Sequence, residues 1–297
     1  MTDLLRKDPG AVPSDLASCL ASGPPRATAF IVTIYGDAVA PRGGVLSMRS
    51  LIEAGRAHGL SESLMRTAVS RLVTAGRLSG ERIGRTSHYR LTEAAQAEFG
   101  AAARILYDPP VAPRGWLFAM TDAAPGEGWA EVASGLWAAP DRSDIDRPEG
   151  LTFAADVVAG APDLPAFAAA HWPLDAVAAA YRTFLSDFAP LRADSAVLRD
   201  VSAEAALVLR LRLVHAYRAA ALADPRLPDA ALPADWPGAA ARALFISAYL
   251  ALSPGADLRI AQVFEDAQGP LPRETEATRD RMQRLGREAA LHNITRK

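Results

Sequence analysis

Most of the side chains that could do chemistry lie in one short stretch of the sequence, between Ser61 and Arg90. At 100° per residue, the apolar residues of its first part share one helix face and the polar residues share the opposite face. The apolar face comprises Met65, Ala68, Val69, Leu72 and Val73, and the polar face comprises Ser63, Arg66, Thr67, Ser70, Arg71 and Thr74. Hydroxyl and guanidinium groups presented together can bond to the phosphates and base edges of duplex DNA.

Some of these side chains are expected to contact bases and others to contact phosphates. Arg66 is our first candidate for reading a base, because its planar fork can bond O6 and N7 of guanine together. Arg82 and Arg85 are expected to contact phosphates, which position a protein without reading sequence. His88 is expected either to contact DNA or to be a solvated strand residue. The predicted DNA contacts are Arg42, Ser61, Ser63, Arg66, Thr67, Ser70, Arg71, Arg82, Arg85 and His88. For any single arginine, the alternative is a solvated charged surface.

The elements that would position these side chains follow in the order of a winged helix-turn-helix. Ser47 and Ser61 are each expected to cap a helix, and Gly76 to end the second of these two. A hairpin that turns at Gly84 would then form the wing. The expected elements are a helix over 30–35, a turn over 36–44, helices from 47 to about 59 and from 61 to 76, strands over 78–83 and 87–91, and a helix over 92–106.

The charge distribution agrees with a DNA-binding module of this extent. Residues 26–104 hold 11 arginines, no lysine and six acidic residues, a net charge of +5, whereas the whole chain has a formal charge of −2. A basic module joined to an acidic remainder is typical of a DNA-binding domain with a separate sensing domain, although scattered surface charge gives the same balance.

The rest of the chain predicts an α+β protein of several domains. Prolines make 107–114 an extended linker. Strands are expected over 116–120, 136–139 and 151–158, and helices over 175–188, 195–222 and 237–251. The predicted organisation is a loose leader over 1–25, a winged-helix domain over 26–106, the linker, a small α/β domain over 115–173, a helical domain over 174–270 and a charged tail over 271–297.

Several other classes of protein are not expected. The sequence lacks the Gly-x-Ser-x-Gly, Walker, dinucleotide-binding and zinc deaminase motifs, so we predict that the chain is not an enzyme. The histidines show no metal-ligand spacing, and the single cysteine, Cys19, fits a reducing cytoplasm. The most apolar helical stretch, 203–223, is interrupted by Arg210, Arg212, His215 and Arg218, so no membrane span is expected.

Motifs along the chain resemble those of the PaaX family, the repressors of phenylacetic acid degradation. The N-terminal motifs are Phe30-Ile-Val-Thr-Ile-Tyr-Gly-Asp37, Pro41-Arg-Gly-Gly44, Met65-Arg-Thr-Ala-Val-Ser-Arg-Leu72, Glu81-Arg-Ile-Gly-Arg85 and Tyr89-Arg-Leu-Thr92. The later ones are Leu136-Trp-Ala-Ala-Pro140, Tyr181-Arg-Thr-Phe-Leu185, Asp224-Pro-Arg-Leu-Pro228 and Leu232-Pro-Ala-Asp-Trp-Pro-Gly238. The similarity covers about residues 27 to 255.

This resemblance implies a homodimeric transcriptional repressor of a phenylacetate catabolic operon, released from DNA by phenylacetyl-CoA. It also implies a ferredoxin-like middle domain. Only eight residues, rich in Gly and Pro, separate Met120 from Trp129, and they cannot supply the helix that such a domain places after its first strand. The middle domain is therefore expected to be abbreviated.

An acyl-CoA effector would need cationic side chains beside an aromatic-lined cleft. The candidates in the helical region are Arg182, Arg210, His215 and Arg218. Structural ion pairs with Asp187, Asp200 or Glu204 explain these arginines equally well. Two further alternatives remain open: a member of the same family that senses another acyl-CoA or none, and an adaptor whose C-terminal part binds a protein partner.

Overall fold

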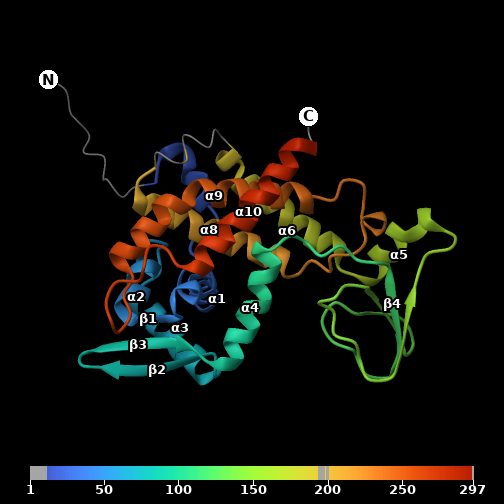
Figure 1. The fold of residues 1–297 in the computed structure, drawn as a ribbon, viewed down its shortest axis with the longest axis horizontal. Coiled ribbons are helices and arrows are strands. Elements are labelled where there is room, and N and C mark those ends of the chain that lie inside the picture. The colour runs from blue at the N-terminus through green and yellow to red at the C-terminus, as the bar shows by residue number, and fades with distance from the viewer. Residues whose placement is uncertain (1–11, 193–197, 199–200, 296–297) are drawn as a thin grey trace. The chain divides into compact units, whose positions relative to one another are not determined.

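The computed structural model describes residues 12–192, 198 and 201–295 and confirms the predicted α+β class (Figure 1). Two antiparallel sheets are present, one of three strands and one of four. The chain forms two compact units. The first comprises residues 1–108, 184–218 and 240–297, and the second comprises residues 109–183 and 219–239. The N-terminal module and most of the C-terminal helices thus share one unit, where the sequence predicted separate domains.

The N-terminal part of the first unit contains the expected helices and hairpin together with an additional strand. Its elements are α1 (Ala27–Ile34), β1 (Val45–Ser47), α2 (Met48–Arg56), α3 (Glu62–Thr74), β2 (Leu78–Ile83), β3 (Thr86–Leu91) and α4 (Glu93–Tyr107). The sheet order is β1-β3-β2, so the hairpin is extended by the short strand before α2. Ser47 and Ser61 cap α2 and α3 as predicted, accepting hydrogen bonds from the amides of Ser50 and Leu64.

The segment between α1 and β1 is helical, not the turn that its glycines and proline suggested. A π-helix over Tyr35–Val39 and a 3₁₀ helix over Ala40–Arg42 continue from α1. Tyr35, Asp37 and Val39 are buried, because the coil turns them into the core of the unit. The chain leaves the helix at Gly43, which has φ +98° and so adopts the left-handed conformation that glycine permits.

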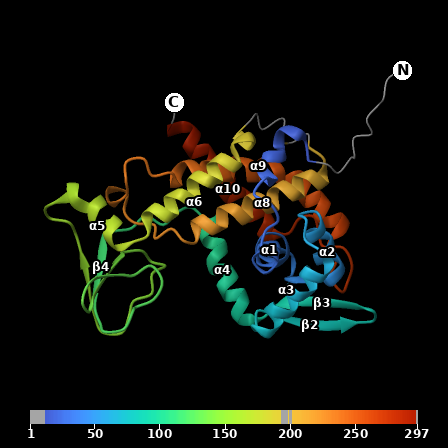
Figure 2. The same cartoon turned by 180° about the vertical axis from the view of Figure 1, so that it is seen from behind.

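The long helices among the described residues of the C-terminal part are α6 (Leu174–Asp187), α8 (Ala203–Ala221), α9 (Gly238–Val263) and α10 (Glu276–Thr295). Within the first unit, α8, α9 and α10 lie over α1 (Figures 1 and 2). Tyr217 of α8 stacks on Phe245 of α9, with 4.2 Å between ring centroids. The predicted charged tail is therefore a packed helix over its described residues, and Leu285 is fully buried in it.

One helix among the described residues, α9, is long and apolar enough to cross a membrane. Within the protein, 61% of its most apolar window is buried. The helix also carries the buried Arg242, which pairs with Glu288 of α10. These contacts identify α9 as the central helix of a protein core.

The second unit is built around a four-stranded sheet in the order β5-β6-β4-β7. The strands are β4 (Trp116–Met120), β5 (Ala130–Ala133), β6 (Leu136–Pro140) and β7 (Leu151–Ala155). Helix α5 (Leu164–His171) packs on one face, where Trp116, Phe167 and Trp172 form an aromatic cluster. No helix follows β4, as expected from the short connection. Neither β5 nor α5 was predicted.

The leader is more ordered than its composition suggested. Residues 1–11 lie outside the described part, but Ser14–Leu20 form a 3₁₀ helix. Leu16 and Cys19 on this helix are buried, and Ser22 donates a hydrogen bond to Asp187 at 2.6 Å. The burial of these two apolar side chains and the hydrogen bond of Ser22 hold the segment on the first unit.

Candidate nucleic-acid interface

Helix α3 separates its apolar and polar residues as predicted. Met65, Ala68, Val69 and Leu72 are buried, whereas Val73, assigned to the same face, is 39% exposed. The exposed polar side chains are those of Ser63, Arg66, Thr67, Ser70, Arg71 and Thr74, and Ser61 at the cap is exposed with them. We call this set the polar face of α3. The apolar residues fix the helix in the unit, so the polar face is held in one orientation.

Arg66 lies in the first half of α3 and is held by a neighbour on the same helix. Its guanidinium pairs with Glu62 at 2.8 Å, and the two side chains are 55% and 53% exposed. An exposed pair of this kind contributes at most about 1 kcal/mol. A phosphate or a guanine edge could therefore displace Glu62 with little loss. The Thr67 hydroxyl donates to the carbonyl of Ser63 at 2.9 Å.

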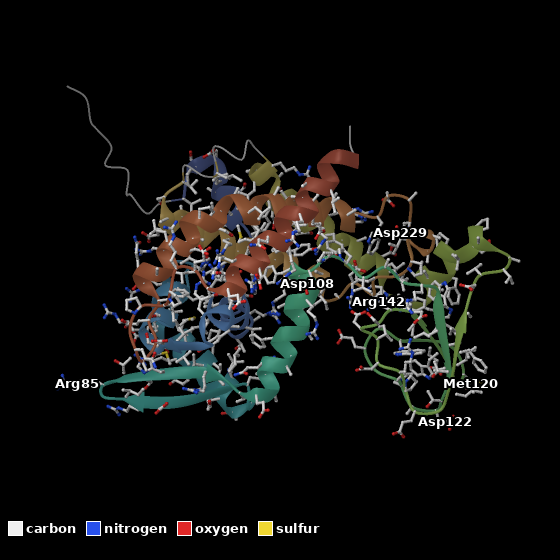
Figure 3. The ribbon with its side chains drawn as sticks, in the orientation of Figure 1. Arg85, Asp108, Met120, Asp122, Arg142 and Asp229 are labelled. Carbon is white, nitrogen blue, oxygen red and sulfur yellow. The ribbon has the colours of Figure 1, made fainter. Side chains whose placement is uncertain are left out.

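The β2–β3 hairpin extends from the end of α3 and carries arginines at its exposed turn. The strands pair in register from Leu78–Leu91 to Ile83–Thr86. Gly84 has φ +62°, which permits the tight turn before Arg85. Figure 3 shows Arg85 at the far tip of the hairpin. Arg82 is also exposed, and its Nε donates to the carbonyl of Gly84 at 3.3 Å.

Hydrogen bonds fix the base of the hairpin to the surrounding helices. Thr92, the cap of α4, donates to the carbonyl of Gly76 at 2.7 Å, which joins the end of α3 to the start of α4. Tyr35 donates to the carbonyl of Tyr89 at 2.8 Å from the buried π-helix. These bonds connect the end of α3 and the hairpin strand β3 to the same unit.

Arg42 does not belong to this surface, contrary to the prediction. Its side chain is only 1% exposed, and it pairs with Asp257 of α9 at 2.8 Å. Its guanidinium also donates to the carbonyls of Ala38, Pro272 and Arg273. The sequence placed Arg42 in an exposed turn, and burial of that segment turns the guanidinium inwards.

His88 is also buried, at 7% exposure. It lies on β3, the middle strand of the sheet, opposite Ser47 on one side and Glu81 on the other. A side chain this buried is neither solvated nor presented to DNA, so this prediction is wrong. Arg90, two residues further along, is exposed on the same strand and was not included in the predicted contacts.

Comparisons with known proteins agree with the extent of these elements. Residues 26–95 match the model for PaaX-like proteins, and residues 172–262 match the model for the PaaX-like protein C-terminal domain. The transcriptional repressor PaaX of Escherichia coli K12 is 30% identical over 281 residues, which cover 84% of this chain and 87% of that protein.

The chain belongs to the PaaX family. This confirms the resemblance found in the sequence motifs and identifies the chain as a regulator and not an enzyme. Among solved structures, an uncharacterized Mycobacterium tuberculosis protein is 22% identical, with a TM-score of 0.49 over 77% of this chain and 96% of its own.

A cluster of buried charged residues includes the last residue of the motif Phe30-Ile-Val-Thr-Ile-Tyr-Gly-Asp37 and the arginine of the motif Pro41-Arg-Gly-Gly44. Asp37 is completely buried and accepts hydrogen bonds from Arg210 of α8 at 3.0 Å and from Arg281 of α10 at 3.3 Å. Tyr107 and Tyr249 also donate to it, at 3.0 and 2.9 Å. We call these five residues, together with Arg42 and Asp257, the Asp37 cluster. It joins the N-terminal module to three C-terminal helices.

The Asp37 cluster also determines the ionisation state of the Asp37 carboxyl group. Burial alone would raise the pKa of Asp37, but the charges of Arg210 and Arg281 and the hydrogen bonds from Tyr249 and Tyr107 hold the pKa below its usual value. Asp37 is therefore ionised at neutral pH. Asp37 was not among the predicted site residues, because an isolated Gly-Asp pair is more typical of a turn.

Of the four predicted effector ligands, Arg210, His215 and Arg218 lie on α8 in the first unit, and none of them lines a common pocket with another in the part of the chain that the structure describes. Arg210 is 1% exposed and serves the Asp37 cluster, so it is not free to bind a ligand. His215 is hydrogen-bonded to Thr33 at 2.9 Å. Arg218 donates to the carbonyl of Ala29 at 3.4 Å. Arg182 belongs to the second unit, where it is exposed and pairs with Asp235.

No group of three or more potential metal ligands occurs among the residues that the structure describes.

Proposed function

We propose that this chain is a DNA-binding transcriptional repressor whose N-terminal module is a winged helix-turn-helix. In this proposal α3 is the recognition helix and the β2–β3 hairpin is the wing. The observation that carries it is the polar face of α3, exposed beside an arginine-tipped hairpin while the opposite face of α3 is buried. A recognition helix requires this separation, because its buried side fixes the geometry with which its outer side meets the major groove.

The predicted contacts divide according to their positions. Arg66, near the start of α3, would read a guanine, and Ser63, Thr67 and Ser70 would contact neighbouring bases or phosphates. Arg71, further along α3, and Arg82 and Arg85 in the wing would contact phosphates. Those contacts would hold the protein in register on the operator. The chain would act in the cytoplasm, where its DNA is.

We further propose that the repressor acts as a homodimer. Exposed apolar side chains on the second unit support this part of the proposal. Met120, Leu151 and Phe153 are 58%, 57% and 48% exposed, and the register of β4 and β7 places them on one face of the sheet. Figure 3 shows Met120 at the end of its strand. β7 is an edge strand, and an open edge beside an apolar face is suited to pairing with a second copy.

Release from DNA would follow the binding of an acyl-CoA, for which phenylacetyl-CoA is the first candidate. The repressor would control the operon for phenylacetate degradation. The support is the family membership of the chain and its 30% identity to the repressor PaaX of E. coli.

The test is a gel-shift titration with the DNA upstream of the gene of this chain. We expect a specific complex with a dissociation constant of about 10 nM or tighter at physiological salt, released by phenylacetyl-CoA but not by CoA or free phenylacetate. A complex that no acyl-CoA releases would favour the alternative of a family member with another effector or none. No complex with any upstream fragment would refute the repressor, and the adaptor alternative would then be preferred.

A further inference from the structure

The first unit contains a cavity of about 310 Å³ between α2 and the helices α8 and α9. Its inner walls are apolar: Leu207, Val208 and Leu211 from α8 and Phe264 after α9 are all at least 90% buried. None of the four effector ligands predicted from the sequence lines it. Its volume is at the lower end of the range for small-molecule sites. It would hold an acyl or aryl group but not a whole nucleotide carrier.

Charged side chains surround the cavity at its rim. Arg259 of α9 reaches Glu53 of α2 at 3.5 Å and Glu204 of α8 at 3.7 Å, so it bridges the two helices through long contacts. Both carboxylates are about half exposed, which makes these pairs weak. Arg56, which is exposed, adds a second guanidinium beside the partly buried Arg259. An anionic group at the rim could therefore recruit two arginines.

A polar group in the wall lacks a partner. His58 is 8% exposed, and its Nδ1 makes no hydrogen bond. Burial, and to a smaller extent the charges of Arg212 and His215, lower the pKa of His58 to about 3, so its ring is neutral at pH 7. A neutral imidazole has one N–H donor and one acceptor nitrogen. It could donate to a carbonyl oxygen of a molecule that fills the cavity.

The cavity lies behind α2, and α2 packs on the proposed recognition helix α3. Gly55 of α2, between two lining residues, packs so closely on α3 that a Cβ atom there would lie 2.6 Å from Sδ of Met65. The other end of α2 is fixed to the end of α9, since Ser50 donates to the carbonyl of Val263 and accepts from the amide of Glu265. A molecule that displaces the C-terminal end of α2 would therefore move α3.

We propose that this cavity is the effector site and that it takes an organic anion with an aryl or acyl body, a carbonyl group and a negatively charged end. The apolar walls would enclose the body, His58 would bond the carbonyl, and Arg56 and Arg259 would hold the charge. A free aryl acid and an acyl-CoA share this chemistry. The proposal rests on the proposed function and assigns a site to it.

Direct binding to the full-length protein without DNA tests the site. Phenylacetyl-CoA, phenylacetate and CoA would be titrated separately by calorimetry. Val208→Trp fills the cavity and should weaken binding of the aryl ligand at least about tenfold, whereas Leu258→Trp, on the exposed side of α9, should leave it unchanged. Arg259→Gln should also weaken binding about tenfold, whereas Arg279→Gln, at an exposed ion pair on α10, should not. Circular dichroism would verify folding of each variant.

The outcomes distinguish a failure of the proposed effector site from a failure of the proposed repressor function. Tighter binding of phenylacetyl-CoA than of phenylacetate identifies the thioester as the ligand, and the reverse identifies the free acid; either supports the site. No binding by an aryl probe, or wild-type affinity in both Val208→Trp and Arg259→Gln, overturns it. If the ligand releases DNA equally well from Val208→Trp, the repressor remains and the site is wrong. If it binds at the cavity without changing operator affinity, the site remains and the effector mechanism is wrong.

Discussion

Replacement of Asp37 by asparagine should destabilise the first unit strongly. The carboxylate receives two guanidinium and two phenolic donors. Asparagine would keep the size but remove the charge, and its NH₂ group would face another donor. Arg281 would then be buried without its counter-ion, and Arg210 would keep only its pair with Asp257. Removal of one partner from a buried ion pair typically costs about 3–5 kcal/mol, which is a large fraction of the roughly 5–15 kcal/mol that stabilises a domain.

The assay is thermal unfolding followed by helical circular dichroism at 222 nm. A loss of about 3–5 kcal/mol predicts a fall in Tm of about 6–20 °C for a unit of this size. Tryptophan fluorescence reports on the second unit, which contains all five tryptophans of the chain. The control is Glu274→Gln at the exposed pair with Arg279, which should change stability by less than about 1 kcal/mol. A similarly small change for Asp37→Asn would refute the reasoning.

Acid should weaken the unit through the same group. The pKa of Asp37 is lower in the folded protein than its unfolded value of about 3.9, so the unfolded chain binds the proton first as pH falls. The stabilisation is therefore fully present above about pH 5 and is lost as pH falls through the folded pKa. In Asp37→Asn the free energy of unfolding, measured by denaturant titration at each pH, should therefore depend less on pH below about pH 5. An unchanged pH dependence would contradict the role of Asp37 in it.

Three further predictions concern DNA and assembly. Arg66→Ala should weaken operator binding by about 1–3 kcal/mol and random-sequence binding much less, as measured by competition gel shifts; equal losses would exclude a base-reading role. Arg85→Ala should weaken both and lower the slope of log K against log salt by about 1, and an unchanged slope would exclude a phosphate contact. Phe153→Glu should convert the proposed dimer to a monomer in light scattering, and a dimer that persists would place the interface elsewhere.

Local patterns were sufficient to predict the elements around α3. Two serine caps, a 3.6-residue apolar period and a glycine turn each have a short-range physical cause, and they placed α2, α3 and the hairpin to within a few residues. The predicted strand over 116–120 also coincides with β4, since its apolar run lies between turn residues.

The residues that were predicted wrongly or not at all are those whose surroundings depend on contacts with distant parts of the chain. Asp37 and Arg42 meet partners more than 170 residues away, and no local pattern indicates such a contact. A cation in an apolar helix needs either a ligand or a buried partner, and the sequence does not show which. Arg210 was therefore predicted to bind a ligand, whereas its partner is the distant Asp37. The cavity behind α2 arises from three segments far apart in the chain and has no motif of its own.

The central claim is that the polar face of α3 and the tip of the hairpin contact duplex DNA. The most direct measurement is a gel shift of the upstream fragment, at about 50 mM salt, by wild-type protein and by a variant with both Arg66 and Arg85 replaced by alanine. We predict a shift by the wild-type protein and a loss of specific binding of at least about tenfold by the variant, whose fold is verified by circular dichroism. Undiminished binding by the folded variant, or no shift by the wild-type protein, would contradict the account.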